Sequence, residues 1–201
     1  MSLRTADITR NTKETQIHLC LALDCPNPAT PDTQIKTDLP FLDHMLTALA
    51  CHGQFGLTLE GRGDVHVDPH HLVEDVGIAL GNAIRDALPG YAGIQRAGSF
   101  AFPMDGTLAV VALDLCGRPN LVWNVTFGHL PIGTLDPHLF REFFKGLVDG
   151  MRGTLHVHVP CIDNDHHGVE AVFKAFARAL RQAVTPLGNP AALSTKGMLD
   201  V

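Results

Sequence analysis

The sequence predicts an α+β fold made by internal duplication, with two similar strand-helix-strand-helix halves and helices packed between or against β-sheets. Three observations predict it. The string His-His-x-x-Glu occurs twice, at residues 70–74 and 166–170, each time just inside an expected helix start. Both halves run in the order strands, helix, strand, helix, which indicates a duplication. Strands occur in runs rather than in strict alternation with helices, which disfavours a doubly wound sheet.

The first half is expected at about residues 14–89. It opens with alternating apolar and polar side chains, as in a half-buried strand. Asp68 and Pro69 predict a helix start, with Asp68 as N-cap and Pro69 in the first helical position, and Pro89-Gly90 predicts its end. The expected elements are strands at 14–23, 55–60 and 64–68, a helix at 41–52 and a helix from 69 to about 88, with a proline-rich loop after the first strand.

The second half is expected at about residues 100–186 and repeats this order. Asp136 and Pro137 predict one helix start, and Asn164 or Asp165 predicts the other. The residues after the last helix, 187–201, read as a loop-like tail. The expected elements are strands at 94–102, 107–115, 120–127 and 154–159, a helix at 138–151 and a helix from 165 to about 184.

The composition is that of a globular protein and excludes several classes. Of the 201 residues, 45% are hydrophobic and 18% are charged, enough for one domain with a substantial core. A formal charge of −6 without a basic stretch argues against nucleic acid as a partner. Without a signal peptide or a membrane-length apolar run, a cytoplasmic protein is expected. Five cysteines without Cys-x-x-Cys indicate a reducing compartment and mostly buried thiols.

The two His-His-x-x-Glu strings have the spacing of helical metal ligands. Residues four apart share a helix face, whereas neighbours lie about 100° apart. His70 and Glu74 can therefore hold one ion, and His71 serves a second ion or a second face. Such a mixed nitrogen and oxygen set suits Mn²⁺, Fe²⁺ or Zn²⁺, with Mn²⁺ favoured if carboxylate and water complete an octahedron. The second copy supplies His166 with Glu170, and His167.

Aligning the halves without gaps extends both ligand sets. His44 in F-L-D-H-M then falls opposite Glu142 in L-F-R-E-F, so we infer that these two side chains complete the sets. A single His-His pair is more often a surface or capping feature, but two copies at matching places favour metal binding. The remaining histidines show no such repetition and are interpreted as structural: His18, His66, His129, His138, His156 and His158.

Motifs along nearly the whole chain occur in the order of one known family. They include R-N-T-K-E-T (10–15), F-L-D-H-M (41–45), D-P-H-H-L-V-E-D-V-G (68–77), N-D-H-H-G-V-E-A-V-F-K (164–174) and S-T-K-G (194–197). Together they resemble the imidazoleglycerol-phosphate dehydratases. The resemblance implies a hydro-lyase of L-histidine biosynthesis that converts D-erythro-imidazole glycerol phosphate to imidazole acetol phosphate and water.

The resemblance also implies architecture and metal content. It implies a single domain over residues 1–201, with a fold like the second domain of ribosomal protein S5 and a phosphate-binding tail at 187–201. It implies two Mn²⁺ per active site and a homo-oligomer of 24 subunits that share active sites. Glu142 stands where the family often has His. The implied metal ligands are His44, His70, His71, Glu74, Glu142, His166, His167 and Glu170.

The reaction lacks a carbonyl next to the carbon that loses its hydrogen, so the imidazole ring must act as electron sink. We hypothesise a metal-bound imidazolate that expels the C3 hydroxyl through a diazafulvene-like intermediate, before loss of the C2 proton gives an enol that ketonises. Glu14 is the candidate for contact with the departing hydroxyl, and Glu74 or Glu170 for proton transfer. The resemblance implies substrate or phosphate binding by Glu14, Arg96, Arg118, Lys174, Ser194 and Lys196.

Three other functions compete with this interpretation. A dinuclear metal-dependent phosphate-ester hydrolase would use the same metals and phosphate pocket, but such enzymes usually rely on bridging Asp. The nearby aspartates here read as caps or outer groups: Asp43, Asp68, Asp75 and Asp165. A metal-storage shell would not need Glu14, Arg96 and Lys196 together. A ribosomal-type binding module of related fold is disfavoured by the acidic balance.

Overall fold

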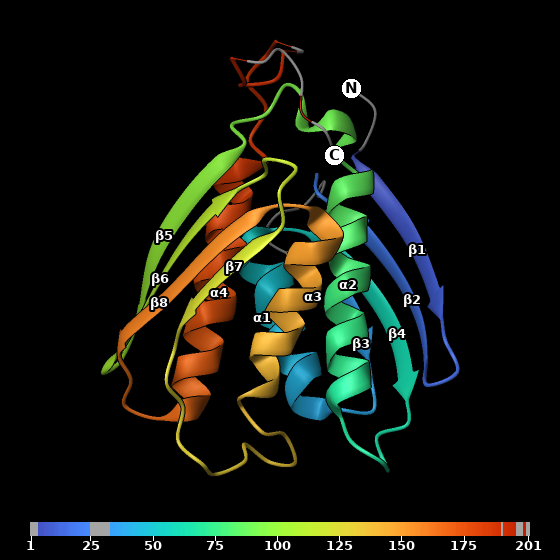
Figure 1. Cartoon of the computed structure of the whole chain (residues 1–201), viewed down its shortest axis with the longest axis vertical. Helices are drawn as coiled ribbons and strands as arrows, with labels where there is room; N and C mark the ends of the chain where they lie inside the picture. The colour runs from blue at the N-terminus through green and yellow to red at the C-terminus, as the bar shows by residue number, and fades with distance from the viewer. Residues whose placement is uncertain (1–3, 25–32, 190, 196–198, 200–201) are drawn as a thin grey trace.

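The computed structural model describes residues 4–24, 33–189, 191–195 and 199, and within these ranges a pair of four-stranded sheets encloses four α-helices (Figure 1). The first half contains β1 (Thr5–Asn11), β2 (Thr15–Ala22), β3 (Thr33–Lys36), α1 (Pro40–Gly53), β4 (Gly56–Gly63) and α2 (His70–Asp86). A 3₁₀ turn, η1 (Pro89–Tyr91), leads to the second half. That half contains β5 (Ala97–Met104), β6 (Thr107–Asp114), β7 (Asn120–Asn124), α3 (Leu139–Met151), β8 (Thr154–Cys161) and α4 (Asp165–Ala183).

The two sheets have the same topology, which confirms the predicted α+β duplication. Their strand orders are β1-β2-β4-β3 and β5-β6-β8-β7. In each sheet the last pair in this order is parallel and the other pairs are antiparallel. The inner sheet faces pack on the helices, so each half is a β-β-β-α-β-α unit.

Three sequence-based expectations about strands were wrong. The edge strands β1 and β3 were not expected, because every second side chain of each is only half-buried and neither shows a strong apolar alternation. The segment 64–68 is a turn rather than a strand. The amide of Val67 donates to the carbonyl of Asp64 at 2.7 Å, and the Val67 side chain is exposed.

Three helices begin within three residues of the capping residue that the sequence suggested, but only Asn164 occupies the N-cap position itself. Asn164, rather than Asp165, caps α4, since its side-chain oxygen accepts from the amide of His167 at 2.8 Å. Asp68 accepts from the amide of His70 at 2.7 Å, although Pro69 occupies the capping position of α2. Asp136 likewise accepts from the amide of His138 at 2.9 Å, next to the start of α3. These caps place both histidine doublets in first helical turns.

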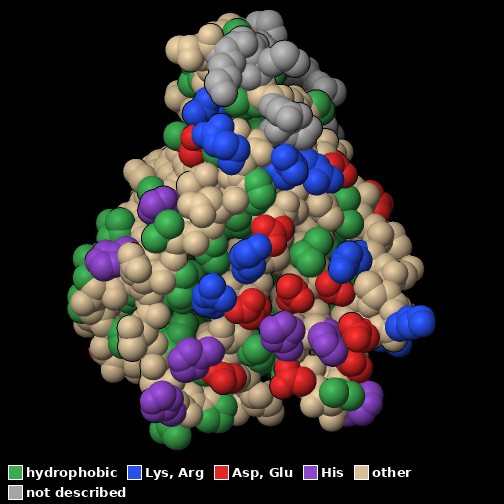
Figure 2. All heavy atoms as spheres, viewed as in Figure 1, with side chains coloured by type: hydrophobic (Ala, Val, Ile, Leu, Met, Phe, Trp, Pro, Cys, Tyr) green, Lys and Arg blue, Asp and Glu red, His purple; other side chains and the backbone are tan. Residues whose placement is uncertain are grey.

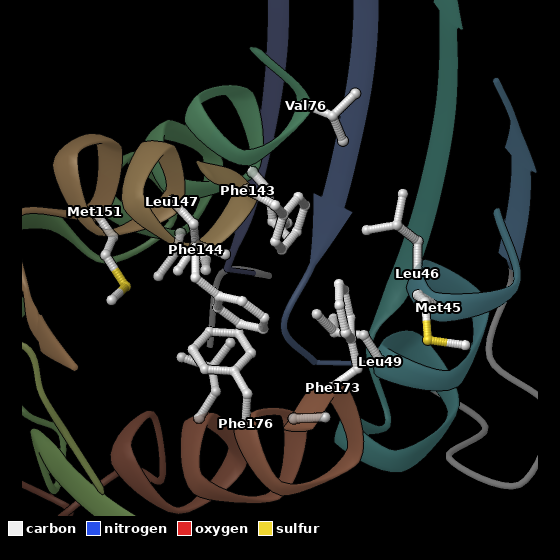
Figure 3. Close-up of a cluster of buried hydrophobic side chains, with 14 of the residues drawn as sticks. Met45, Leu46, Leu49, Val76, Phe143, Phe144, Leu147, Met151, Phe173 and Phe176 are labelled. Carbon is white, nitrogen blue, oxygen red and sulfur yellow. The ribbon is translucent and has the colours of Figure 1, made fainter. Parts of the chain in front are cut away.

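The two halves share one hydrophobic core, which joins helices from both (Figure 3). Aromatic rings of α3 and α4 lie at its centre: Phe143 and Phe173 have centroids 5.1 Å apart, and Phe144 and Phe176 are 5.6 Å apart. Leu46 and Leu49 of α1 close the same cluster from the first half. The position of each doublet therefore depends on both halves.

Helices α2 and α3 touch through their backbones. Glycines four residues apart on each helix make this contact, Gly77 and Gly81 on α2 and Gly146 and Gly150 on α3. A Cβ at Gly81 would lie 2.2 Å from the carbonyl oxygen of Leu147, closer than real Cβ atoms approach. Because α2 carries the first doublet, this contact also sets its position.

Gly81→Ala is expected to lower the melting temperature, because its methyl group forces α2 and α3 apart. Overpacking of this kind costs about 1–3 kcal/mol. Thermal unfolding followed by circular dichroism measures the effect, with Thr47→Ala on the exposed face of α1 as control. Equal melting temperatures for both variants would contradict the close helix contact.

The cysteine side chains are more exposed than the sequence suggested. Of the four cysteines in the described residues, Cys116 is buried, Cys20 is half-buried, and Cys51 and Cys161 are exposed. The thiols are therefore not mostly buried.

No helix in the described ranges is both long and apolar enough to cross a bilayer.

Candidate metal centre

The four helices begin at the same end of the molecule, at the bottom of Figure 1. Their first two turns carry the predicted ligands, and Figure 2 shows histidine and acidic side chains gathered over this end. Helix N-termini carry partial positive charge, which favours carboxylates there. We call the end formed by residues 40–44, 70–74, 139–142 and 165–170 the helix-start face.

His44, His166 and Glu170 form a ligand group on the helix-start face that joins α1 to α4. Oε2 of Glu170 lies 3.3 Å from Nε2 of His166 and 3.7 Å from Nε2 of His44. Two donors each about 2.1 Å from one ion can be at most about 4.2 Å apart, so both separations fit a shared cation. The set of two imidazoles and a carboxylate suits a divalent transition metal. The structure thus brings His44, from the first half, to the second doublet, a pairing that the sequence did not specify.

Glu170 is held as a carboxylate in this group. Its burial works to raise the pKa, but the hydrogen bond and charge of Lys174, with the nearby His44 and His166, outweigh burial and lower the pKa below its usual value. Nζ of Lys174 lies 2.7 Å from Oε1 of Glu170, which leaves Oε2 directed to the histidines. Lys174, expected to bind phosphate, is thus an ion-pair partner of Glu170 in this structure.

The second histidine of each doublet is oriented by an aspartate. Nδ1 of His71 lies 3.1 Å from both carboxylate oxygens of Asp64, and Nδ1 of His167 lies 3.1 Å from both of Asp163. The hydrogen bond that His71 donates to Asp64 raises the pKa of His71. An imidazole held at Nδ1 by a carboxylate presents Nε2 to a metal, as in many metal sites.

The doublet histidines face different directions, as their spacing predicted. The rings of His70 and His71 are 84° apart, and those of His166 and His167 are 90° apart. His70 lies with Glu74, whose Oε2 is 3.9 Å from Nε2 of the histidine. Each first histidine therefore pairs with the glutamate of its own helix, and each second histidine pairs with a loop aspartate.

Two further acidic groups complete a repeated arrangement. Glu14, in the β1–β2 turn, lies with Asp64 and His71, and its Oε2 is 3.8 Å from Nδ1 of His71. Asp105, in the β5–β6 turn, lies with Asp163 and His167 in the same way, at 3.7 Å from Nδ1 of His167.

Sequence reasoning identified Glu14 but missed Asp64, Asp163 and Asp105. Asp64 and Asp163 each precede a doublet in the sequence, and this repetition could have identified them as partners of the doublet histidines. The repetition was overlooked because residues 64–68 were interpreted as a strand.

Glu142 stands apart from these groups. It lies in the first turn of α3, and its Oε1 accepts from Nη1 of Arg141 at 2.8 Å. Among the described residues, no group of three metal-competent side chains includes it. Its assignment as a ligand therefore rests on the alignment of the two halves.

Unlike Lys174 and Glu14, the expected phosphate-binding residues Arg96 and Arg118 lie at the opposite end of the molecule from the helix-start face. The amide of Arg96 donates to the carbonyl of Ala183 at the end of α4, and its guanidinium contacts Asp114 at 2.7 Å. At 1.5 Å per residue, that end of α4 is about 25 Å from His166. Nη1 of Arg96 also donates to the carbonyl of Leu193, which places the tail before Ser194 at this end. Arg118 is exposed and follows the end of β6 by four residues. Lys196 lies outside the described residues.

Asp64→Asn is expected to weaken metal binding by about 10- to 100-fold, because outer partners of metal-bound histidines have effects of this size. The amide keeps the shape of the carboxylate but not the charge that holds His71 at Nδ1. Competition with a chelator for Mn²⁺ measures the affinity. Asp86→Asn at the exposed end of α2 is the control, and equal affinities for both variants would refute the orienting role.

The fold and the site together define a class, a duplicated α+β protein whose helix starts present histidine and carboxylate groups able to bind divalent metals. Residues 37–180 match the model of the imidazoleglycerol-phosphate dehydratase family. The chain belongs to this family and is an enzyme of the hydro-lyase class.

Similar proteins cover nearly the full chain. The imidazoleglycerol-phosphate dehydratase of Geobacter metallireducens is 49% identical over 198 residues, 98% of this chain and 99% of that protein. That of Nitrosomonas europaea is 46% identical over 201 residues, 99% of this chain and 100% of that protein. The crystal structure of the Staphylococcus aureus enzyme is 35% identical, with a TM-score of 0.80 over 90% of this chain and 99% of that one. The structure from Pyrococcus furiosus has a TM-score of 0.82 and 35% identity, over 96% and 100%.

Proposed function

We propose that this enzyme dehydrates D-erythro-imidazole glycerol phosphate to imidazole acetol phosphate in L-histidine biosynthesis, in the cytoplasm. Family membership supports the substrate and the reaction. The observation that carries the metal dependence is the convergence of His44, His166 and Glu170 beside an aspartate-oriented doublet histidine. A simple proton-transfer enzyme would not need this many convergent histidines.

The proposed cofactor is Mn²⁺, two ions per active site, held by the doublet residues and their partners. A bound cation of this kind supplies Lewis-acid polarisation and a template for the imidazole ring. The mixed nitrogen and oxygen donors support Mn²⁺ over a softer ion, because no sulfur ligand is among them. The proposed ligands are His44, His70, His71, Glu74, Glu142, His166, His167 and Glu170.

The carboxylates at the helix-start face are proposed to move the protons. Glu14 lies beside His71 at the β1–β2 turn, a position from which its Oε2 can contact the departing C3 hydroxyl. Glu170 is held as a carboxylate with Oε1 paired to Lys174, so its Oε2, which faces His44 and His166, is the oxygen proposed to accept and return a proton. Glu74 is the equivalent group in the other half. The imidazole ring of the substrate would supply the electrons that expel the C3 hydroxyl with its C–O bond pair, and it would take back the electron pair of the C–H bond when the C2 proton leaves.

We also propose that each active site combines residues of different subunits. The helix-start face and Arg96 lie at opposite ends of α4, about 25 Å apart by helical rise. A small phosphorylated imidazole cannot span that length, so one chain alone brings Lys174 but not Arg96 to the proposed metal ligands. This supports a homo-oligomer, with 24 subunits as the expected form. Its phosphate contacts are proposed for Arg96, Arg118, Lys174, Ser194 and Lys196, the last two in the tail at 187–201.

The direct experiment incubates Mn²⁺-loaded protein with imidazole glycerol phosphate and follows the ketone product, with a chelator-treated sample as control. Ketone formation without free phosphate is the expected result. Release of inorganic phosphate would instead identify a phosphate-ester hydrolase. Tight metal binding with neither product would identify a storage protein.

A further inference from the structure

A second group of metal-competent side chains lies on the outer face of the first sheet, away from the helix-start face. It consists of Asp7 on β1 and His18 and Cys20 on β2. Their neighbours Ile17 and Leu19 point inward to the core, so the three side chains point outward. The register pairs Asp7 directly with Cys20, and His18 is two residues along β2 on the same face. The side chains therefore converge without any loop to hold them.

The donor atoms already have nearly the spacing of a tetrahedral site. Oδ1 of Asp7 lies 3.0 Å from Nε2 of His18, and Sγ of Cys20 lies 3.5 Å from Oδ2 of Asp7 and 3.8 Å from Nε2 of His18. With the bond lengths of a zinc site, tetrahedral donors are about 3.4–3.6 Å apart. Small side-chain rotations therefore suffice to bring all three donors onto one ion.

The group is open to solvent on the side where an ion would enter. The side chains of Asp7 and His18 are 69% and 57% exposed, and Cys20 is half-buried. A thiolate ligand selects a soft or borderline cation such as Zn²⁺ over Mn²⁺. Three protein ligands leave a fourth position for water, as in zinc sites that are not closed.

The duplication gives an internal comparison. Thr15 and Thr107 are the equivalent buried threonines that begin β2 and β6, and each donates from its hydroxyl to an aspartate. Counting from them, Val110 and Ala112 correspond to His18 and Cys20, and Ser99 pairs with Ala112 as Asp7 pairs with Cys20. The second sheet therefore forms the same strand pairing with no potential metal ligand at these positions. The group therefore belongs to the first half alone, unlike the doublets of the helix-start face.

We propose that Asp7, His18 and Cys20 form a separate site for Zn²⁺, with water as the fourth ligand. On binding, the Cys20 thiol loses its proton to solvent and the resulting thiolate bonds to the ion. The ion then joins β1, an edge strand, to β2. This assigns His18 a role that its isolation in the sequence did not suggest.

Cobalt is the probe that separates this site from the helix-start face, because only the proposed site contains sulfur. The assembled protein is first loaded with Mn²⁺ and then titrated with Co²⁺. The expected result is a thiolate-to-cobalt charge-transfer band in the near ultraviolet that saturates at one ion per chain and is abolished by added Zn²⁺. Absence of the band from the wild-type protein would overturn the proposal.

Two matched variants assign the band to its residues. Cys20→Ser is expected to abolish it, whereas Cys161→Ser, which removes an exposed thiol from β8 of the other sheet, is expected to keep it. Retention of the band in Cys20→Ser would refute the assignment. A second measurement uses the wild-type protein alone: Zn²⁺ is expected to slow alkylation of Cys20 but not of Cys161, and equal rates with and without Zn²⁺ would count decisively against the site.

Discussion

Glu170→Gln is expected to lower kcat/KM by about 10²- to 10⁴-fold, the range for loss of a general acid or base. The amide keeps the shape of Glu170 but removes the charge that faces His44 and His166. It also leaves the ammonium of Lys174 without its ion partner at 2.7 Å. The measurement is steady-state kinetics on imidazole glycerol phosphate, with Mn²⁺ content determined on the same samples.

The matched control for this variant is Glu60→Gln. Glu60 lies on β4 between the buried Leu59 and Gly61, so its side chain, 62% exposed and 3.2 Å from Arg62, points away from the helices. Full activity in this control with a large loss in Glu170→Gln would support the role of Glu170. Unchanged kcat/KM in both variants would remove Glu170 from the proposed mechanism.

Mixed assemblies of two inactive variants are expected to regain activity. Glu170→Gln damages the helix-start face, and Arg118→Ala removes an exposed cation proposed for phosphate binding at the other end of the chain. If subunits share active sites, random mixing of equal amounts leaves about a quarter of the sites with both residues intact. Coexpression of differently tagged chains, followed by tandem purification and the dehydratase assay, makes the measurement.

This rescue distinguishes shared sites from sites within one chain. In the latter case every site of a mixed assembly would carry one lesion, and the mixture would be as inactive as its parents. Mixtures of each variant with itself, prepared in the same way, supply the baseline. The outcome depends on how the residues are distributed between chains, and it does not depend on the reaction intermediates.

Local patterns predicted most of the helices because caps and periodicity act over a few residues. Asn164 and Asp68 mark the starts of α4 and α2, because their side chains accept hydrogen bonds from backbone amides two or three residues further along the chain. The edge strands β1 and β3 escaped prediction, since an edge strand buries less and its pattern is weaker. The turn at 64–68 looked like a strand because its valines alternate with polar residues, although only tertiary contacts decide whether such residues are buried.

The sequence by itself determined the duplication and the two sets of paired ligands, because helical spacing sets which of His70, His71 and Glu74 share a face. It did not determine which helix meets which ligand pair. Only the packing of α1 on α4 brings His44 to Glu170, and only the loops before α2 and α4 bring Asp64 and Asp163 to the doublets. Such contacts join residues far apart in sequence, and they arise from close packing of a common core, which no local pattern encodes.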